Sequence, residues 1–401
     1  MIPYGQHYLD EDDIAAVVDV LRSGALTQGP KVNEFENKIA AYVGANFAVA
    51  VSSGTAALHL ACLAANFKKT DVVFTSANTF VASANCVQYV GAKITFTDID
   101  TNSLNMAPDD LLRKCAAAEN VKGIIPVHFA GLSCDMAKIK TIADEYDAIV
   151  IEDASHALGG NYEDGGKIGN CKFSDMTTFS FHPVKGIAAG EGGMITTNNK
   201  YLYNKLLQLR SHGIYKGNFD FPGISIADEH IQNSENAFDN GELNPWYYEM
   251  QELGYNYRIT DIQCALALSQ LNKIDSFIER RRDFAARYDK AFSNLKYFKP
   301  GQLFGGDRSS HHIYVLRIKF DEIGKTRKEV MMSLAKQGVG SQVHYIPVPM
   351  HPYYEKLGFS LKDYKEVEQY YNEALTIPLY YPLTNENVNA VIDAVLNILS
   401  K

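Results

Sequence analysis

The stretch IVIEDASH (residues 149–156) lies at the centre of the expected fold. Its first three residues are apolar and β-branched, which is typical of a strand buried on both faces of a parallel sheet. Because successive side chains of a strand point to opposite faces, at most one of Glu152 and Asp153 faces a cleft. Open α/β sheets bind ligands at this carboxyl end of their strands. A carboxylate here either meets a cation or caps a following helix.

Similar short apolar runs lie on both sides of this stretch and alternate with segments of helical period. The expected strands span residues 47–52, 72–75, 94–97, 123–127, 149–152, 176–181 and 193–197. The expected helices between them include residues 55–66, 82–90, 108–118 and 136–146. Strands that are apolar on both faces and separated by helices predict an α/β fold with a mostly parallel central sheet.

The sequence changes character after residue 215. Residues 216–252 are rich in Gly, Asn, Asp and Pro and show no sustained period, which predicts a long surface excursion. One long helix is expected over residues 261–292, followed by strands at 313–320 and 340–344 and helices at 327–337, 361–374 and 386–399. We therefore expect a large domain over residues 1–260 and a smaller C-terminal α+β domain over residues 261–401.

Composition excludes several classes of protein. The 401 residues carry 38 Lys and Arg against 47 Asp and Glu, a net charge of −9, which argues against nucleic acid or an anionic membrane as the main partner. No apolar run is long enough to span a membrane and no signal peptide opens the chain, so a cytoplasmic protein is expected. The six cysteines are scattered without metal-ligand spacing, so we expect buried, reduced thiols and no metal site.

Two further segments carry candidate chemistry. The sequence SSGTAA (52–57) follows a strand and opens a helix, where free N–H groups and the helix dipole favour a phosphate, although a simple helix cap fits as well. Lys185, in FSFHPVKG (179–186), follows another apolar strand. Among apolar neighbours its pKa would fall and its neutral amine could attack a carbonyl, whereas most loop lysines are simply solvated.

The order of these segments is more informative than any one of them. Along the chain, a phosphate-binding helix start is followed by an acid and then by a lysine. Pyridoxal phosphate enzymes need these three groups to bind the phosphate, the ring nitrogen and the aldehyde of the cofactor. Phe80 could lie flat against the cofactor ring or belong to the core. The chain has no G-x-G-x-x-G after a strand, no G-x-x-x-x-G-K-[ST] and no G-x-S-x-G, so nicotinamide enzymes, nucleotide triphosphatases and serine hydrolases lack their motifs.

At these positions the chain resembles the DegT/DnrJ family of sugar aminotransferases, which are fold type I pyridoxal phosphate enzymes. The matching segments run through nearly the whole chain: SGALTQGPKVNEFE (23–36), SSGTAALHLA (52–61), ANTFVASAN (77–85), IEDASHALGG (151–160), FSFHPVKGIAAGEGGMITTN (179–198), LRSHGI (209–214), ELGYNYRITDIQCALALSQL (252–271) and VHYIPV (343–348). The resemblance implies the fold type I arrangement, a large α/β domain and a small C-terminal domain.

The resemblance also implies individual roles. The positions that match cofactor-binding residues are Gly54, Thr55, Ala56, Phe80, Asp153, His156, Ser180, Lys185 and Asn256. Among them, Lys185 is the catalytic residue and bonds covalently to the cofactor, Asp153 contacts the ring nitrogen, His156 lies near the phenolic oxygen, and Asn256 reaches the phosphate of a second subunit. The positions that match the sugar-nucleotide site are Tyr4, Gly24, Ala25, Leu26, Thr27, His311, His312, Ile313 and Tyr314.

The activity implied is transamination, in a homodimer with shared sites. Glutamate would give its amino group to the cofactor, leaving pyridoxamine phosphate and 2-oxoglutarate, and C4 of a UDP-linked 4-keto-6-deoxy-N-acetyl hexosamine would receive it, as in pseudaminic acid biosynthesis. The alternatives are another NDP-4-keto or 3-keto sugar aminotransferase and a non-catalytic pyridoxal phosphate sensor. A dehydratase of the same fold is disfavoured, because those relatives replace the lysine with histidine and Lys185 is present.

Overall fold

The computed structural model describes residues 1–216, 234–302 and 306–399. Its main feature is a seven-stranded sheet built from β1 (Phe47–Val51), β2 (Val72–Ser76), β3 (Lys93–Thr97), β4 (Val121–Ile125), β5 (Ile149–Asp153), β6 (Met176–Ser180) and β7 (Gly193–Thr197). The strand order is β1-β7-β6-β5-β4-β2-β3. Strand β7 runs antiparallel to both of its neighbours, and the remaining pairs are parallel. The expected α/β fold with a mostly parallel sheet is therefore confirmed, with strand ends within two residues of the expected ones.

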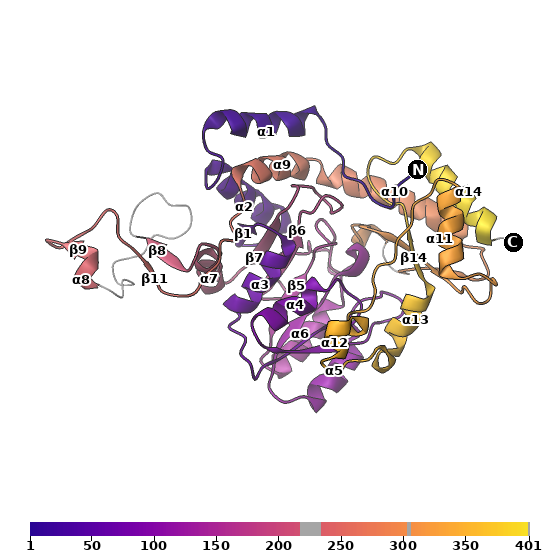
Figure 1. Cartoon of the computed structure of the whole chain (residues 1–401), viewed down its shortest axis with the longest axis horizontal. Helices are drawn as coiled ribbons and strands as arrows, with labels where there is room; N and C mark the ends of the chain where they lie inside the picture. Colours follow the sequence, from indigo (N-terminus) through magenta and orange to yellow (C-terminus); the bar gives the residue numbers. More distant parts are fainter. Residues whose placement is uncertain (217–233, 303–305, 400–401) are drawn as a thin grey trace.

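Helices cover both faces of this sheet (Figure 1). One face packs against α3 (Gly54–Ala64), α4 (Ala82–Tyr89) and α7 (Lys200–Arg210). The other packs against α2 (Pro30–Val43), α5 (Pro108–Ala117), α6 (Met136–Glu145) and α9 (Asp261–Leu271). The alternation of side chains explains this division, since Val150 lies in one core and Ile151 in the other.

The C-terminal part has a core of its own, formed by α10 (Ile274–Phe292) from Phe284 onward and the elements that follow it. A three-stranded antiparallel sheet joins β12 (Phe298–Pro300), β13 (Tyr314–Ile318) and β14 (Ala374–Ile377). The helices are α11 (Arg327–Lys336), α12 (Pro352–Glu355), α13 (Lys365–Glu373) and α14 (Asn385–Leu399), with 3-10 turns η1 (Phe129–Gly131), η3 (Gly306–Arg308), η4 (Val348–Met350) and η5 (Leu361–Asp363). The domain boundary at residue 260 stays a prediction. The core of the C-terminal part and one core of the large sheet both include residues of α10.

Three expected elements of the C-terminal part were wrong in detail. The single helix over 261–292 is two helices that break at Asn272 and Lys273; apolar spacing misses the break because Leu271 and Ile274 are buried on either side of it. Residues 340–344 form no strand, and only Gln342 makes an isolated bridge, to Thr376. The helix expected over 361–374 begins as the turn η5 and becomes helical only at Lys365.

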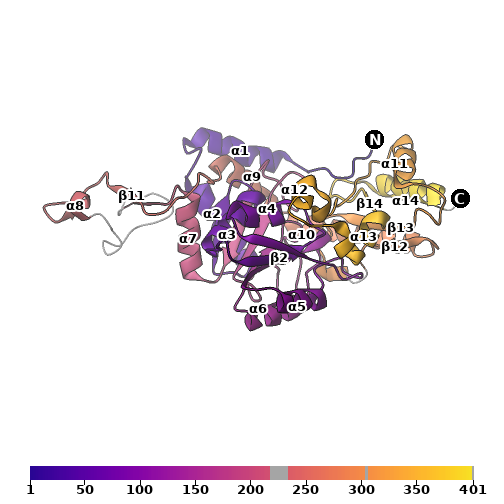
Figure 2. The ribbon, with the colours of Figure 1, turned by 60° about the horizontal axis from the view of Figure 1, so that its bottom comes forward.

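The expected surface excursion is described in part, since residues 217–233 lie outside the described residues. Strand β8 (Ile214–Lys216) pairs antiparallel with β11 (Tyr248–Met250), and this ribbon leads to α8 (Ser234–Ala237), β9 (Phe238–Asp239) and β10 (Glu242–Leu243). In two views the ribbon and α8 extend away from the body (Figures 1 and 2). All six cysteines are buried and unpaired. None of the helices in the described ranges has the length and hydrophobicity to cross a membrane.

The N-terminal segment crosses to the C-terminal part before it enters the large sheet's layers. Gly340 N–H donates to the Ile2 carbonyl at 2.8 Å, and Ile2 N–H donates to the Gly338 carbonyl at 2.7 Å. Helix α1 (Glu11–Ser23) then packs along α9 (Figure 1). This path carries residues 4 and 5 past the carboxyl ends of the sheet strands, where they line a cavity.

Strand β1 is an edge strand whose outer backbone groups are satisfied by a buried ion pair. Ala50 N–H donates to the Glu36 carboxylate at 2.8 Å, and the Arg210 guanidinium donates to the Ala50 carbonyl at 2.8 Å. Arg210 and Glu36 also contact each other at 2.6 Å, and both are at most 6% exposed. The pair closes an edge that would otherwise offer free hydrogen-bonding groups.

We expect Glu36→Ala to destabilise the protein by about 3–5 kcal/mol, because it leaves a buried guanidinium and a backbone N–H without an acceptor. Glu34→Ala is the matched control, since the Glu34 side chain is 41% exposed and its pairs with Lys31 and Lys38 contribute at most about 1 kcal/mol. Urea denaturation followed by circular dichroism measures both. Equal losses of unfolding free energy in the two variants would contradict this account.

Candidate active site

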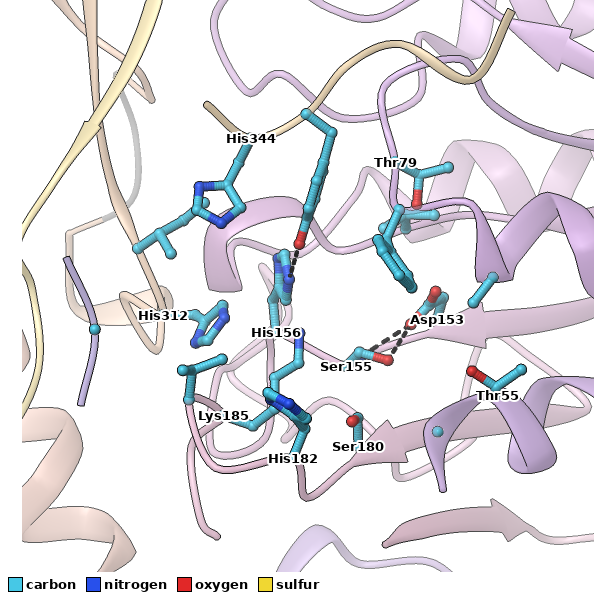
Figure 3. Close-up of a pocket in the computed structure, with 18 of the residues that line it drawn as sticks. Thr55, Thr79, Asp153, Ser155, His156, Ser180, His182, Lys185, His312 and His344 are labelled. Atoms are coloured by element: carbon cyan, nitrogen blue, oxygen red, sulfur yellow. Dashed lines mark hydrogen bonds between the residues drawn. The ribbon is translucent and has the colours of Figure 1, made fainter. Parts of the chain in front are cut away.

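A cavity of about 460 Å³ opens at the carboxyl ends of β5 and β6 (Figure 3). Its volume lies in the range of small-molecule sites. Residues from both parts of the chain line it, among them Tyr4, Gly54, Thr55, Phe80, Asp153, Ser155, His156, Ser180, His182, Lys185, His312, Ile313, His344 and Tyr345. Most of the residues proposed above for cofactor binding are therefore brought together.

Asp153 is the acidic residue of this cavity. Its carboxylate accepts hydrogen bonds from Ser83 Oγ at 2.6 Å and from the Ser155 N–H and Oγ at 3.1 and 2.6 Å. It is 5% exposed, and no helix begins after it, so the helix-cap interpretation was wrong. A buried carboxylate held by three donors and still open to the cavity is suited to hold a positively charged group.

Glu152 points to the opposite face of β5, as the strand alternation required. Its carboxylate accepts from the Tyr162 hydroxyl at 2.8 Å, from Thr177 Oγ1 at 3.0 Å and from Ser174 Oγ, and it lies 2.6 Å from His128 Nε2. Every lone pair is directed at a donor of the protein interior, so this acid is structural and Asp153 alone faces the site.

Lys185 follows β6, is partly buried and lines the cavity. Burial lowers the pKa of its amine to about 8, an effect that the Asp153 carboxylate partly opposes. A substantial fraction of the amine is therefore neutral near physiological pH, which is the form that attacks a carbonyl. The solvated-lysine interpretation was wrong, and the nucleophile interpretation fits the geometry.

The start of α3 forms the opposite side of the cavity. Ser53 is the N-cap, and its Oγ accepts the Ala56 N–H at 3.1 Å, while its carbonyl accepts the Ala57 N–H. These contacts leave the N–H groups of Gly54 and Thr55 without an acceptor in the part of the chain that the structure describes. The cap interpretation is confirmed, since Ser53 caps the helix, and the phosphate site stays a prediction that fits, because the next two residues line the cavity. Ala56 itself packs into the core.

Gly54 is needed for the close approach of α3 and β6. A Cβ atom at position 54 would lie 2.7 Å from the Cβ and 3.1 Å from the Oγ of Ser180. Only glycine lets the Ser180 hydroxyl sit beside the free N–H groups of the helix. This cradle of hydroxyl and backbone donors fits a phosphate.

Phe80 is 56% exposed although it is a large apolar side chain. It lies over the cavity, with its ring centroid 5.9 Å from that of Tyr345. An apolar ring left open on one face matches the stacking role expected for it.

The residues proposed for the sugar divide between several places. Tyr4, His312 and Ile313 line the main cavity. His311 and Tyr314 line a separate small cavity together with Ile313, and the Tyr314 hydroxyl donates to Asp289 at 2.6 Å. His311 has a left-handed backbone conformation and Tyr314 begins β13, so the four consecutive side chains do not all face one ligand.

Two further sets lie outside the cavity lining of the described residues. Gly24, Ala25, Leu26 and Thr27 follow α1, and Thr27 makes an isolated bridge to Thr260. Asn256 is exposed and bridges Ser211. The Asp261 N–H also donates to the Leu26 carbonyl, so residues 24–27 lie beside the start of α9.

Sequence patterns alone did not single out His344 and Tyr345, which both line the cavity. His344 Nδ1 lies 2.9 Å from Thr376 Oγ1, and Tyr345 Oη lies 2.9 Å from His156 Nε2. His344 fell in the strand wrongly expected over 340–344 and both residues in the segment VHYIPV, but neither pattern gave them a role, and the segment is irregular in the structure.

Comparison with known proteins identifies the family to which the chain belongs. Residues 7–396 match the family described as the DegT/DnrJ/EryC1/StrS aminotransferase family. The chain belongs to this family. It is therefore an aminotransferase, as its motifs indicated.

Two curated relatives align along nearly the whole chain. The spore coat polysaccharide biosynthesis protein SpsC of Bacillus subtilis is 38% identical and aligns over 99% of this chain and 97% of its own length. The UDP-4-amino-4,6-dideoxy-N-acetyl-beta-L-altrosamine transaminase of Campylobacter jejuni is 36% identical and aligns over 100% and 98%.

Two solved structures share the fold. Helicobacter pylori PseC, an aminotransferase of pseudaminic acid biosynthesis, superposes with a TM-score of 0.87 at 29% identity, covering 100% of this chain and 99% of PseC. The sugar aminotransferase Spr1654 of Streptococcus pneumoniae, solved in its PMP form, has a TM-score of 0.87 at 30% identity, with the same coverage. Enzymes of this family depend on pyridoxal phosphate, and the cradle at Gly54, the acid Asp153 and the amine of Lys185 fit that cofactor.

The lowered pKa of Lys185 predicts how the cofactor-free protein takes up pyridoxal phosphate. Because the neutral amine reacts, the rate of covalent loading should rise with pH around a midpoint near 8, rather than near the 10.5 of a solvated lysine. Stopped-flow absorbance with borohydride trapping and peptide mapping measures the rate at Lys185. A midpoint above pH 10 would show that the amine is not desolvated.

Proposed function

We propose that this aminotransferase binds pyridoxal phosphate at Lys185 and transfers the amino group of L-glutamate to C4 of a UDP-linked 4-keto-6-deoxy-N-acetyl hexosamine. The products are a UDP-4-amino sugar and 2-oxoglutarate. The observation that carries the proposal is the cavity in which the Lys185 amine, the Asp153 carboxylate and the helix start at Gly54 converge. The relatives named for this sugar in Campylobacter and for the pseudaminic acid pathway in Helicobacter support the substrate.

Pyridoxal phosphate supplies an aldehyde that bonds to amines and a ring that accepts electrons when a neighbouring carbon loses its proton. Asp153 would stabilise the protonated ring nitrogen. Gly54, Thr55 and Ser180 would donate to the phosphate, and Phe80 would lie against the ring. Lys185, with its amine free, would be the base that takes and returns the proton. Its lowered pKa suits this task, because it exchanges a proton readily near neutral pH.

The sugar is proposed to enter on the side of Tyr4, His312 and Ile313. His312 is 6% exposed, and its Nδ1 has no partner among the described residues. Burial, followed by the nearby His156, lowers its pKa well below the ordinary value, so the ring is neutral. A neutral imidazole with an unpartnered nitrogen in a cavity wall is suited to a sugar hydroxyl.

A homodimer with shared sites is part of the proposal. Asn256 and residues 24–27 were expected at the cofactor and the sugar, yet they do not line the cavity of their own chain, and all of them but Ala25 are exposed. In a two-fold dimer the same surface of each copy faces the other, so this set can complete the partner's cavity.

A panel of nucleotide sugars tests which substrate the enzyme prefers. The panel includes other sugars because the relative SpsC is named for spore coat polysaccharide biosynthesis. We expect kcat/KM for the UDP-linked 4-keto-6-deoxy-N-acetyl hexosamine with glutamate to exceed that for dTDP-4-keto and 3-keto sugars by at least about tenfold, a typical value for lost pocket contacts. Mass spectrometry and NMR of the product give its mass and configuration. A preference for another sugar supports the alternative of a different aminotransferase within the family, and absence of turnover with all of them supports a sensor.

Lys185→Ala should reduce turnover by at least about 10²–10⁴-fold, because it removes the general base. Lys172→Ala is its control, since Lys172 is an exposed lysine paired with Asp164.

Shared sites predict complementation between two inactive variants. Lys185→Ala and Asn256→Ala chains, mixed under conditions that exchange subunits, should form heterodimers in which one site carries both defects and the other carries neither. At equal mixing, half of the dimers are heterodimers with one intact site, so about a quarter of wild-type activity should return. Activity that stays at the level of the separate variants would mean that each site is built within one chain.

A further inference from the structure

His156 has both ring nitrogens engaged inside the protein. The Ala130 N–H donates to Nδ1 at 3.3 Å, and Nε2 lies 2.9 Å from Tyr345 Oη (Figure 3). A backbone N–H can only donate, so Nδ1 is the acceptor nitrogen of the imidazole and the proton sits on Nε2. Burial, followed by the charge of Lys185, lowers the pKa of His156 well below its ordinary value, so the ring is neutral.

The tautomer of His156 sets the direction of the Tyr345 hydroxyl. Since Nε2–H donates to Tyr345 Oη, the hydroxyl proton must point elsewhere. Among the described residues this hydroxyl makes no other hydrogen bond, and the rings around it are those of Phe80, Phe129 and His344. Tyr345 lines the cavity, so its proton points into the cavity. Burial, and to a lesser extent Asp153, raises the pKa of the hydroxyl, which stays protonated.

The chemical structure of pyridoxal phosphate indicates which of its atoms would lie beside Tyr345 and His156. The phosphate arm and the phenolic oxygen stand on opposite sides of the axis from the ring nitrogen to the aldehyde carbon. Figure 3 shows Thr55 and Ser180 on one side of the cavity and His156 on the other, with Lys185 beside His156. A ring with its nitrogen at Asp153 and its phosphate at Thr55 turns its phenolic oxygen toward His156 and Tyr345.

His156 has no N–H left for that oxygen, although the family resemblance places it there. We propose that Tyr345, held in place by His156, donates its hydroxyl proton to the phenolic oxygen of the cofactor. His156 is then a positioning residue, and the line Ala130 N–H, His156, Tyr345 is a one-way hydrogen-bond relay. The proposal rests on the proposed function, because it requires pyridoxal phosphate at Lys185.

The relay has a spectroscopic consequence. A donor at the phenolic oxygen stabilises its negative charge, and most strongly when the nitrogen shared with Lys185 has lost its proton and no longer neutralises that charge. Removing the donor should therefore raise the pH at which the chromophore loses its proton. The other titratable groups that line this cavity are Tyr4, Asp153, His182, Glu191, His312, His344 and Tyr380, and they are unchanged in the test.

The test is an absorbance titration of the loaded protein. For Tyr345→Phe we expect the midpoint to rise by about one to two pH units, the shift that corresponds to one hydrogen bond to a charged group. Tyr354→Phe is the matched control, because its buried hydroxyl donates to Asn85 at 2.6 Å and lies outside the cavity lining. It should leave the midpoint unchanged. Equal midpoints in wild type and Tyr345→Phe would overturn the assignment.

A second measurement needs no cofactor. Nitrogen-15 NMR of the cofactor-free protein, with His156→Gln to assign the signals, should show the Nε2–H tautomer at neutral pH in wild type. A cationic ring or an Nδ1–H tautomer would overturn the relay. A wild-type protein that never acquires the chromophore overturns the proposed function and this assignment with it, whereas a loaded wild type with an unshifted Tyr345→Phe variant overturns this assignment alone.

Discussion

The parallel pairing of β5 with β6 is the constraint on which the site depends. It sets Asp153 opposite Thr178, so that both strands end at the same edge of the sheet and the chain beyond β6 carries Lys185 back over that edge. The carboxylate thus comes from the sheet itself, and the amine comes from the turn that directly follows the neighbouring strand. The burial that lowers the pKa of Lys185 is a consequence of the same packing.

The two acids at the end of β5 show how a strand separates structure from chemistry. Glu152 has its oxygens directed at hydroxyl and imidazole donors of the interior, whereas Asp153 has donors on one side and the cavity on the other. The two acids therefore have different functions because their surroundings differ, although they are neighbours in the sequence. Glu152 is a structural charge because each of its lone pairs has a protein donor. Asp153 is available to a ligand because it also faces the cavity.

The cavity of one chain lacks some of the groups assigned to it. Asn256 and residues 24–27 lie outside its lining, although the family motifs that contain them point to cofactor and substrate. The residues proposed to contact the sugar, Tyr4 and His312, come instead from the N-terminal segment and the C-terminal part. In the proposed function, the large sheet therefore supplies the residues for the cofactor, and segments outside the sheet supply those for the substrate.

The sequence by itself determined the alternating strands and helices, the identity of the acid and the lysine, and the cofactor chemistry, because periodicity and motif order are local properties. It could not show the break between Leu271 and Ile274, since apolar spacing continues through it. It also could not place His344 and Tyr345, which lie in an irregular segment. Only the tertiary structure decided that His156 is occupied by Ala130 and Tyr345, because hydrogen-bond direction depends on which groups meet in space.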